Sequence, residues 1–284
     1  MRRVFVIIAV SLVFLIGLSV LLYPYAADYV NSLNQSRVVA RYYEDTAAVD
    51  TAEADALLKK AEDYNRALAQ NPNRFKLTEA ELAEYYEQMR YRGSEIMGII
   101  AIDKIDVRLP VYHGTSEGVL QIGAGHFEGT SIPVGGLGTH AVITGHRGVP
   151  SSTLLTHLDQ MEIGDTFVVT ALNRTLTYMV DQIVVVEPDE LEALAIDAEK
   201  DYCTLVTCTP YGINSHRMLV RGIRTANEAE ETVEEQAATA EEAERTDQGK
   251  LLIFGIAAAT GIAAVAAIAR IWKWRRGIRQ ERRR

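Results

Sequence analysis

Two long apolar segments lie near the ends of the chain, and neither contains a charged residue. Residues 4–23 are rich in Val, Ile, Leu and Phe, and residues 251–269 are rich in Ala, Ile and Leu. Each segment has about the 20 residues that a helix needs to cross a bilayer. The pattern therefore predicts two transmembrane helices. A cleaved signal peptide is the alternative for the first segment, and a buried core helix is the alternative for the second.

Between these segments, the apolar positions first follow a helical period and then an alternating one. Apolar residues recur at helical spacing in residues 51–70, and Thr78 with Glu81 has the pattern of a capping box before a second apolar stripe. From about residue 98 onward, alternating segments separated by Gly- and Pro-rich turns predict strands, and Pro110 in the first of them indicates an edge or a bulge. The predicted strands include residues 105–112, 141–144, 165–170, 175–186, 204–208 and 217–223. Many short strands of this kind indicate an all-β barrel or sandwich.

Charge indicates how the two apolar segments are oriented. Arg2 and Arg3 precede the first segment, and residues 270–284 carry seven Arg and one Lys against one Glu. Because positively charged flanks stay in the cytoplasm, both termini are expected inside the cell and the region between the segments outside it. The formal net charge is −9 although both ends are basic. The central region is therefore acidic, which argues against nucleic acid as a partner.

The expected organisation is a cytoplasmic N-terminus, a transmembrane helix, an extracytoplasmic helical region, a β-domain, an acidic linker, a second transmembrane helix and a basic cytoplasmic tail. In this order, the parts comprise residues 1–3, 4–23, 24–94, 95–224, 225–250, 251–269 and 270–284. We therefore expect a two-span protein of the cell membrane whose central domain is extracytoplasmic.

The two cysteines, Cys203 and Cys208, lie on one predicted strand. In an extended chain their Cα atoms are about 16 Å apart, which is beyond the reach of a disulfide. An exported domain would then carry two free thiols, which suggests that the chemistry of a thiol is used. Cys208 ends its strand beside a loop, where substrate can reach a side chain. Burial as an inert apolar residue is the alternative.

A histidine and an arginine also stand at predicted strand ends. Arg217 opens the strand after Cys208, and antiparallel pairing would return it beside the thiol, where a guanidinium lowers the thiol pKa or holds an oxyanion. His146 ends another strand, and a Cys with a His is the usual minimum for thiol acyl transfer. The residues alone leave six histidines as candidates, at positions 113, 126, 140, 146, 157 and 216. A metal site is disfavoured, because the two cysteines cannot face one ion and the histidines lack a paired spacing.

Three segments resemble the class C, pilin-assembling sortases. TLVTC at residues 204–208 is similar to the TLxTC pattern around the nucleophile of that family, and the similarity continues through TPYGINSHRMLVRG to residue 222. VYHGTSEGVLQIGAGHFEGTSIPVGG at residues 111–136 and ITGHRGVPSS at residues 143–152 resemble it as well. The resemblance implies a mainly β fold: a sortase-type closed barrel of about eight strands with short helices, preceded by a helical region and flanked by the two transmembrane helices.

The resemblance also implies a role for each candidate residue. Cys208 would be the nucleophile, His146 the general acid and base, and Arg217 the group that stabilises the oxyanion or the substrate. No metal or organic cofactor is implied. Cys203 and His216 are expected to face away from the site and to have no catalytic role. His113 and His126 are expected to support the fold or to line a groove.

The implied activity is that of a cysteine transpeptidase, which cleaves an LPxTG-like sorting signal between Thr and Gly through a thioester. The acyl group would pass to a lysine amine of a pilin subunit, so that the partners are proteins with such a signal, a pilin lysine and the lipid bilayer. The alternatives are a sortase that attaches surface proteins to peptidoglycan and a non-catalytic membrane-held scaffold. Many class C sortases carry an Asp-Pro-aromatic lid motif. The nearest sequence here is Asn71-Pro72-Asn73, and a lid of different chemistry is left open within residues 71–93.

Overall fold

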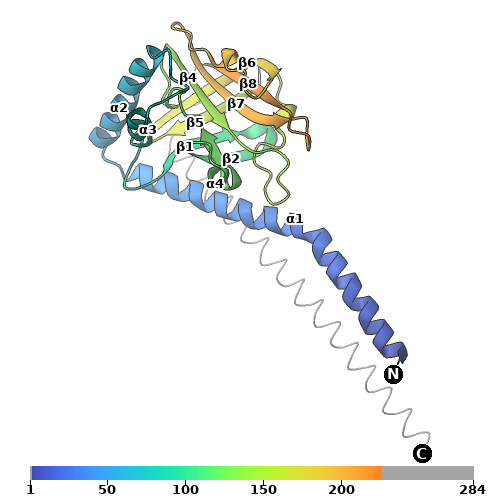
Figure 1. Cartoon of the computed structure of the whole chain (residues 1–284). Coiled ribbons are helices and arrows are strands. Elements are labelled where there is room, and N and C mark those ends of the chain that lie inside the picture. The colour runs from blue at the N-terminus through green and yellow to red at the C-terminus, as the bar shows by residue number, and fades with distance from the viewer. Residues whose placement is uncertain (1, 226–284) are drawn as a thin grey trace, which may run out of the picture.

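The computed structural model describes residues 2–225. The predicted acidic linker, the second apolar segment and the basic tail lie outside the described residues, so the second predicted transmembrane helix belongs to that part of the chain. The described residues form one long N-terminal helix, two helices that follow it, and a β-barrel whose connections include a fourth, short helix (Figure 1).

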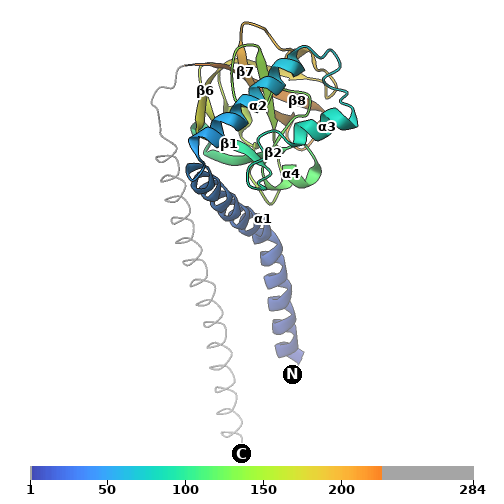
Figure 2. The same cartoon turned by 90° about the vertical axis from the view of Figure 1, so that its left-hand side faces the viewer.

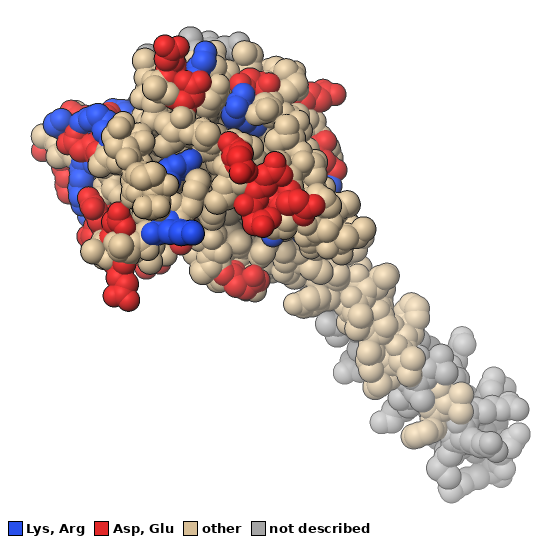
Figure 3. Space-filling model, turned by 45° about the horizontal axis from the view of Figure 1, so that its top comes forward, with Lys and Arg blue, Asp and Glu red and all other residues tan. Residues whose placement is uncertain are grey.

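Helix α1 (Arg2–Ala47) continues well past residue 23, where the first transmembrane helix is predicted to end. Between Arg3 and Asp28 the helix carries no charged residue, and Figure 3 accordingly shows the described part of this section without acidic or basic colours. By length and composition, Ser11–Ala47 contains a stretch that can cross a membrane, and none of that stretch is buried. Pro24 lies inside the helix and removes a backbone hydrogen bond, which accounts for the bend in Figure 1.

Two shorter helices follow α1 and cover the side of the barrel (Figure 2). Helix α2 (Thr51–Ala69) begins at Asp50, whose side chain accepts a hydrogen bond from the backbone of Ala52. Helix α3 (Glu79–Tyr86) begins with the predicted capping box, in which Thr78 and Glu81 satisfy each other's backbone N–H groups. The apolar faces of these helices pack against residues of the barrel and its loops in one buried cluster. The helices contribute Ala54, Leu58, Ala61, Tyr64, Leu68 and Tyr85, and the barrel and its loops contribute Met97, Ile132 and Val134.

Eight strands close into a barrel in the order β1-β2-β3-β4-β7-β8-β6-β5. Their bounds are β1 Ile96–Ile102, β2 Val107–His113, β3 Ala124–His126, β4 Thr139–Thr144, β5 Thr166–Ala171, β6 Arg174–Val186, β7 Asp201–Thr209 and β8 His216–Arg224. Short helical segments join some of them: α4 (Glu117–Ile122) and the 3₁₀ turns Asp103–Ile105, Leu158–Gln160 and Glu192–Leu194. The predicted closed barrel of about eight strands with short helices is confirmed.

Alternate residues of each strand fill the inside of the barrel. Ile143, Leu205 and Val220 are fully buried there and belong to one continuous cluster. Burying one such side chain contributes about 1.5–3 kcal/mol, so the barrel interior is the main source of stability. The intervening residues of the same strands point outward and are available for other contacts.

A buried polar group connects α3 to the barrel. His126 on β3 is fully buried, and its Nε2 donates a hydrogen bond to the carbonyl oxygen of Ser131 at 2.8 Å. Its Nδ1 contacts the hydroxyl of Tyr85 on α3 at 3.0 Å. Burial lowers the pKa of His126 from its ordinary value of 6.5 to about 4, so the ring is neutral in the folded protein at neutral pH. His126 therefore has a structural role, as expected from the sequence.

This lowered pKa predicts that the protein loses stability in mild acid. The unfolded chain binds a proton at His126 below about pH 6.5, whereas the folded chain binds it only near pH 4, so the free energy of unfolding falls between these values as the pH falls. Within this window, His126→Gln is expected to reduce the slope by up to about 1.4 kcal/mol per pH unit. Urea unfolding of the full chain in detergent at several pH values measures the slope. The exposed His157→Gln is the control, and an unchanged slope in His126→Gln would contradict the assignment.

Candidate active site

The register of three neighbouring strands brings the candidate residues to one level. Strands β4 and β7 run parallel with Thr144 opposite Val206, and continuing this register by two residues sets His146 level with Cys208. Strands β7 and β8 are antiparallel, and Cys208 is directly paired with Arg217. The predicted return of Arg217 beside Cys208 is therefore confirmed.

Strand alternation determines the side of the barrel on which these side chains lie. Leu205 and Val220 point into the core. On β7, Leu205 lies three residues from Cys208, and on β8, Val220 lies three residues from Arg217. Positions three apart on a strand face opposite sides. Cys208 and Arg217 consequently lie on the outer surface of the barrel, where a substrate can reach them.

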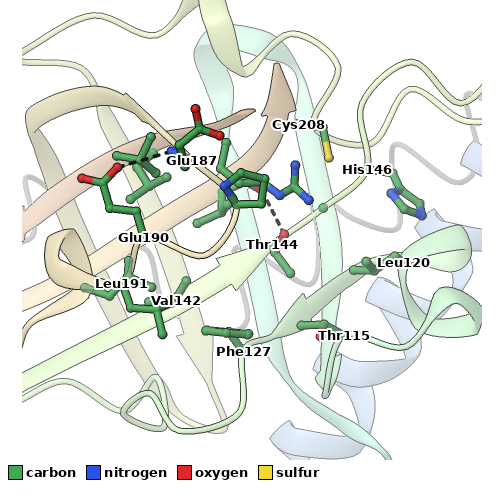
Figure 4. Close-up of a pocket in the computed structure, with 17 residues that line it drawn as sticks. Thr115, Leu120, Phe127, Val142, Thr144, His146, Glu187, Glu190, Leu191 and Cys208 are labelled. Atoms are coloured by element: carbon green, nitrogen blue, oxygen red, sulfur yellow. Dashed lines mark hydrogen bonds between the residues drawn. The ribbon is translucent and has the colours of Figure 1, made fainter. Parts of the chain in front are cut away.

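A cavity of about 340 Å³ opens at this surface and contains all three candidate residues in its lining. Figure 4 shows Cys208 and His146 at the same end of it, and the apolar side chains of Phe127, Val142 and Leu191 further away. The complete lining is Thr115, Leu120, Phe127, Val142, Thr144, Gly145, His146, Val186, Glu187, Pro188, Glu190, Leu191, Leu194, Val206, Cys208, Arg217 and Leu219. The cavity thus joins a thiol, an imidazole and a guanidinium to a largely apolar groove, a combination typical of peptide-binding thiol enzymes.

His146 is held from two sides. Its backbone carbonyl oxygen accepts a hydrogen bond from the N–H of Leu155 at 3.2 Å, which closes the loop that follows β4. Its Nε2 lies 3.4 Å from a carboxylate oxygen of Glu117 on α4. This contact restrains the orientation of the imidazole ring. Glu117 could not be singled out from the sequence, because the contact joins two segments with no shared pattern.

The guanidinium of Arg217 is fixed by its own turn. Nη1 donates hydrogen bonds to the carbonyl oxygens of Asn214 at 3.3 Å and of His216 at 3.1 Å. His216 itself contacts Glu187 through Nε2 at 3.2 Å and is not among the residues that line the described cavity. These bonds hold the guanidinium in one orientation, in the lining of the same cavity as Cys208.

The second cysteine has a different environment. Cys203 is fully buried in the interior of the barrel, and both cysteines are free. Burial, together with the nearby carboxylate of Asp201, raises the pKa of the Cys203 thiol well above its usual range. The predictions that Cys203 packs in the core and that it forms no disulfide with Cys208 are confirmed. Its thiol is inert, whereas Cys208 is partly exposed.

Residues 71–76, where the sequence lacks the Asp-Pro-aromatic lid motif, pack against the wall of the cavity from outside. Arg74 donates hydrogen bonds to the carbonyl oxygens of Gly129 and Leu194, both at 2.7 Å. The ring of Phe75 lies 6.0 Å from that of Phe127, which lines the cavity. These contacts fasten residues 71–76 to the apolar end of the groove.

Comparisons with known proteins agree with this geometry. Residues 100–225 match the Sortase domain family. The structure of sortase C1 from Streptococcus agalactiae is 44% identical with a TM-score of 0.65, covering 68% of this chain and all of that chain. Sortase C from Streptococcus pneumoniae is 42% identical with a TM-score of 0.61, covering 68% of this chain and 98% of that chain. Sortase D of Bacillus subtilis (strain 168) is 28% identical over 114 residues, or 40% of this chain and 54% of that protein.

The chain therefore belongs to the sortase family, and its structural relatives from Streptococcus agalactiae and Streptococcus pneumoniae belong to class C. Its match spans about half the length of the curated relatives sortase D of Bacillus subtilis and sortase A of Streptococcus agalactiae, at 54% and 50%. Sortases are cysteine transpeptidases associated with the membrane of the Gram-positive cell surface. The apolar helix α1 is consistent with such an association.

Proposed function

We propose that this chain is a cysteine transpeptidase that cleaves an LPxTG-like sorting signal between Thr and Gly and transfers the acyl group to a lysine amine of a pilin subunit. The observation that supports the proposal is that Cys208, His146 and Arg217 line one cavity in a chain of the sortase family. The apolar groove beside them, with Val142, Leu191 and Leu194 among its residues, suits the Leu and Pro of such a signal.

The first half of the proposed reaction forms a thioester. The Cys208 thiolate attacks the carbonyl carbon of the signal's threonine, and the negative charge moves to the carbonyl oxygen. Arg217 stabilises this oxyanion, a contribution of about 2.7–4 kcal/mol for one such donor in other acyl-transfer enzymes. As the C–N bond breaks, protonated His146 gives its proton to the leaving glycine nitrogen. The threonine is then bound to the sulfur of Cys208.

The second half releases the product. A neutral amine attacks the thioester carbon and loses a proton to His146 as the C–S bond breaks. The thiolate of Cys208 and the protonated His146 are restored, so no external oxidant or reductant is consumed. Water in place of the amine would give hydrolysis by the same steps.

A pilin lysine is the proposed acceptor because the structural relatives are class C sortases, and the Streptococcus pneumoniae structure is described in relation to catalysis and pilin substrate specificity. We further propose that α1 and residues 251–269 both span the membrane, with both termini in the cytoplasm and the barrel outside. Confinement of the enzyme and its membrane-bound substrates to one surface raises their effective concentration.

Incubation of the full chain in detergent micelles with a pilin subunit that carries an LPxTG-like signal tests this function. We expect a ladder of covalent multimers on a denaturing gel, with a Thr–Lys isopeptide bond identified by mass spectrometry. A Cys208→Ala chain prepared in parallel is the control. Transfer only to a peptidoglycan stem-peptide amine would instead favour wall anchoring, and the absence of both products would favour the non-catalytic scaffold.

A further inference from the structure

The part of α1 that follows its apolar section contacts the loop that carries His146. Asp28 Oδ1 accepts hydrogen bonds from the backbone N–H of Thr153 at 2.7 Å and from its hydroxyl at 3.0 Å. One turn further along the helix, Asn31 Nδ2 donates to the carbonyl oxygen of Ser151 at 2.7 Å. These bonds join positions more than one hundred residues apart in the sequence and fix both the backbone and a side chain of the loop.

Gln35 extends this contact to the other side of His146. Its Nε2 lies 3.3 Å from the hydroxyl of Ser152 and 3.3 Å from the carbonyl oxygen of Ile122, the last residue of α4. Helix α4 is the element that supplies Glu117 to His146. Asp28, Asn31 and Gln35 lie three and four residues apart and therefore share one helix face. We call these three residues the clamp.

The held loop leads back to His146 over a short path. Two residues after Thr153, the N–H of Leu155 donates to the carbonyl oxygen of His146, and the Leu155 side chain is fully buried in the barrel core. The hydroxyl of Thr156 accepts from the N–H of Gly148 at 3.1 Å. A displacement at Thr153 is therefore transmitted to the backbone of His146. In Figure 4 the pale blue ribbon of α1 is visible behind Leu120.

The clamp lies directly after the apolar section of α1. Asp28 is the first charged residue after Arg3, so the clamp begins where the apolar section ends. A helix that crosses a bilayer leaves the hydrocarbon at this kind of boundary. One continuous helix thus includes both the section suited to the membrane and the residues that bond to the His146 loop.

We infer that Asp28, Asn31 and Gln35 are positioning residues for His146, through which the juxtamembrane part of α1 holds the catalytic imidazole at its working distance from Cys208. This inference rests on the proposed function, because it assigns a purpose to the position of His146 in that reaction. Small displacements of an acid or base from the reacting atoms slow proton transfer strongly. Among the described residues, the clamp's hydrogen bonds go to Ser151, Ser152, Thr153 and Ile122, none of which lines the cavity, so the effect is expected on turnover and not on substrate binding.

The test compares four variants of the full chain in lipid nanodiscs: Asp28→Ala, Asp28→Ala with Asn31→Ala, Asp28→Asn and Asp45→Ala. Asp45 is an exposed aspartate on the same helix that pairs only with Arg41 among the described contacts. Peptide cleavage gives kcat and KM for an LPxTG-like peptide. Hydrogen exchange of residues 149–156, followed by mass spectrometry, reports loop order independently of activity.

We expect the double variant to lower kcat by about tenfold while KM stays within about twofold, because orientation is lost and binding is not. Exchange in residues 149–156 should become faster. Asp28→Asn keeps an oxygen that accepts from Thr153 and should recover most of the activity, and Asp45→Ala should match the wild type. A double variant with wild-type kcat overturns the inference. A wild-type chain that is as inactive as Cys208→Ala overturns the proposed function itself, and the two failures are therefore distinguishable.

Discussion

Replacement of Cys208 by alanine is expected to abolish both cleavage of the sorting signal and transfer to an amine. Without the sulfur no thioester forms, and loss of a covalent nucleophile lowers turnover by at least about 1,000-fold in comparable enzymes. Cys208 is partly exposed and makes no disulfide, so its removal leaves the barrel core intact. The change is therefore expected to act on catalysis while the thermal unfolding temperature stays close to that of the wild type.

Thiol labelling provides the matched comparison for this variant. Iodoacetamide should modify Cys208 in the folded protein, whereas Cys203 should react only after denaturation, because burial raises its pKa and excludes the reagent. The folded Cys208→Ala chain should then take up no label. A Cys208→Ala protein that retained full transfer activity would refute the catalytic assignment.

Replacement of Arg217 by alanine is expected to lower kcat by about 100- to 1,000-fold, which is the loss seen when one oxyanion donor is removed. Arg217→Lys should recover only part of this activity, since an ammonium group lacks the planar fork of the guanidinium and cannot make the same set of bonds. Steady-state cleavage of an LPxTG-like peptide measures both constants. If the guanidinium acts on the oxyanion, KM stays near its wild-type value; a rise in KM would indicate that it holds the substrate carbonyl in the ground state.

Arg221 is the control residue for this experiment. It lies four positions further along the same strand, pairs with Asp181 at 2.8 Å and does not line the cavity. Arg221→Ala should reduce stability and leave kcat of the folded protein within about twofold of the wild type. Equal kcat in Arg217→Ala and the wild type would exclude a role for this guanidinium in the reaction.

Local features of the fold follow well from the sequence. The capping box of Thr78 and Glu81 and the strands around Cys208 and Arg217 depend on residues close in the chain, and the structure contains them. Pro110 is informative as well. Its strand β2 pairs with β1 at this position but with β3 only from Val111 onward, so a local edge exists inside a closed barrel.

Features that depend on distant contacts could not be predicted in the same way. Strand order is set by packing between segments far apart in the chain and was not predicted, and closure of the strands into a barrel was expected only through the resemblance to sortases. Glu117 and the clamp on α1 are single polar contacts without any periodic signal. The continuation of α1 past residue 23 could not be predicted either, because Pro24 bends the helix without ending it. The residues beyond it join an apolar cluster with β1 that includes Tyr43 and Ile99.

On the proposed membrane topology, the unbroken course of α1 limits how far the cavity can lie from the lipid surface. The clamp occupies residues 28–35, which is only about 10 Å of helix beyond the apolar section. Once α1 is inserted in a bilayer, the thiol is confined to a shallow aqueous layer and cannot swing outward as it would on a flexible tether. Cleavage would then favour polypeptides whose scissile bond lies at the same distance from the membrane as the thiol. The length of the spacer between signal and membrane would therefore contribute to substrate selection.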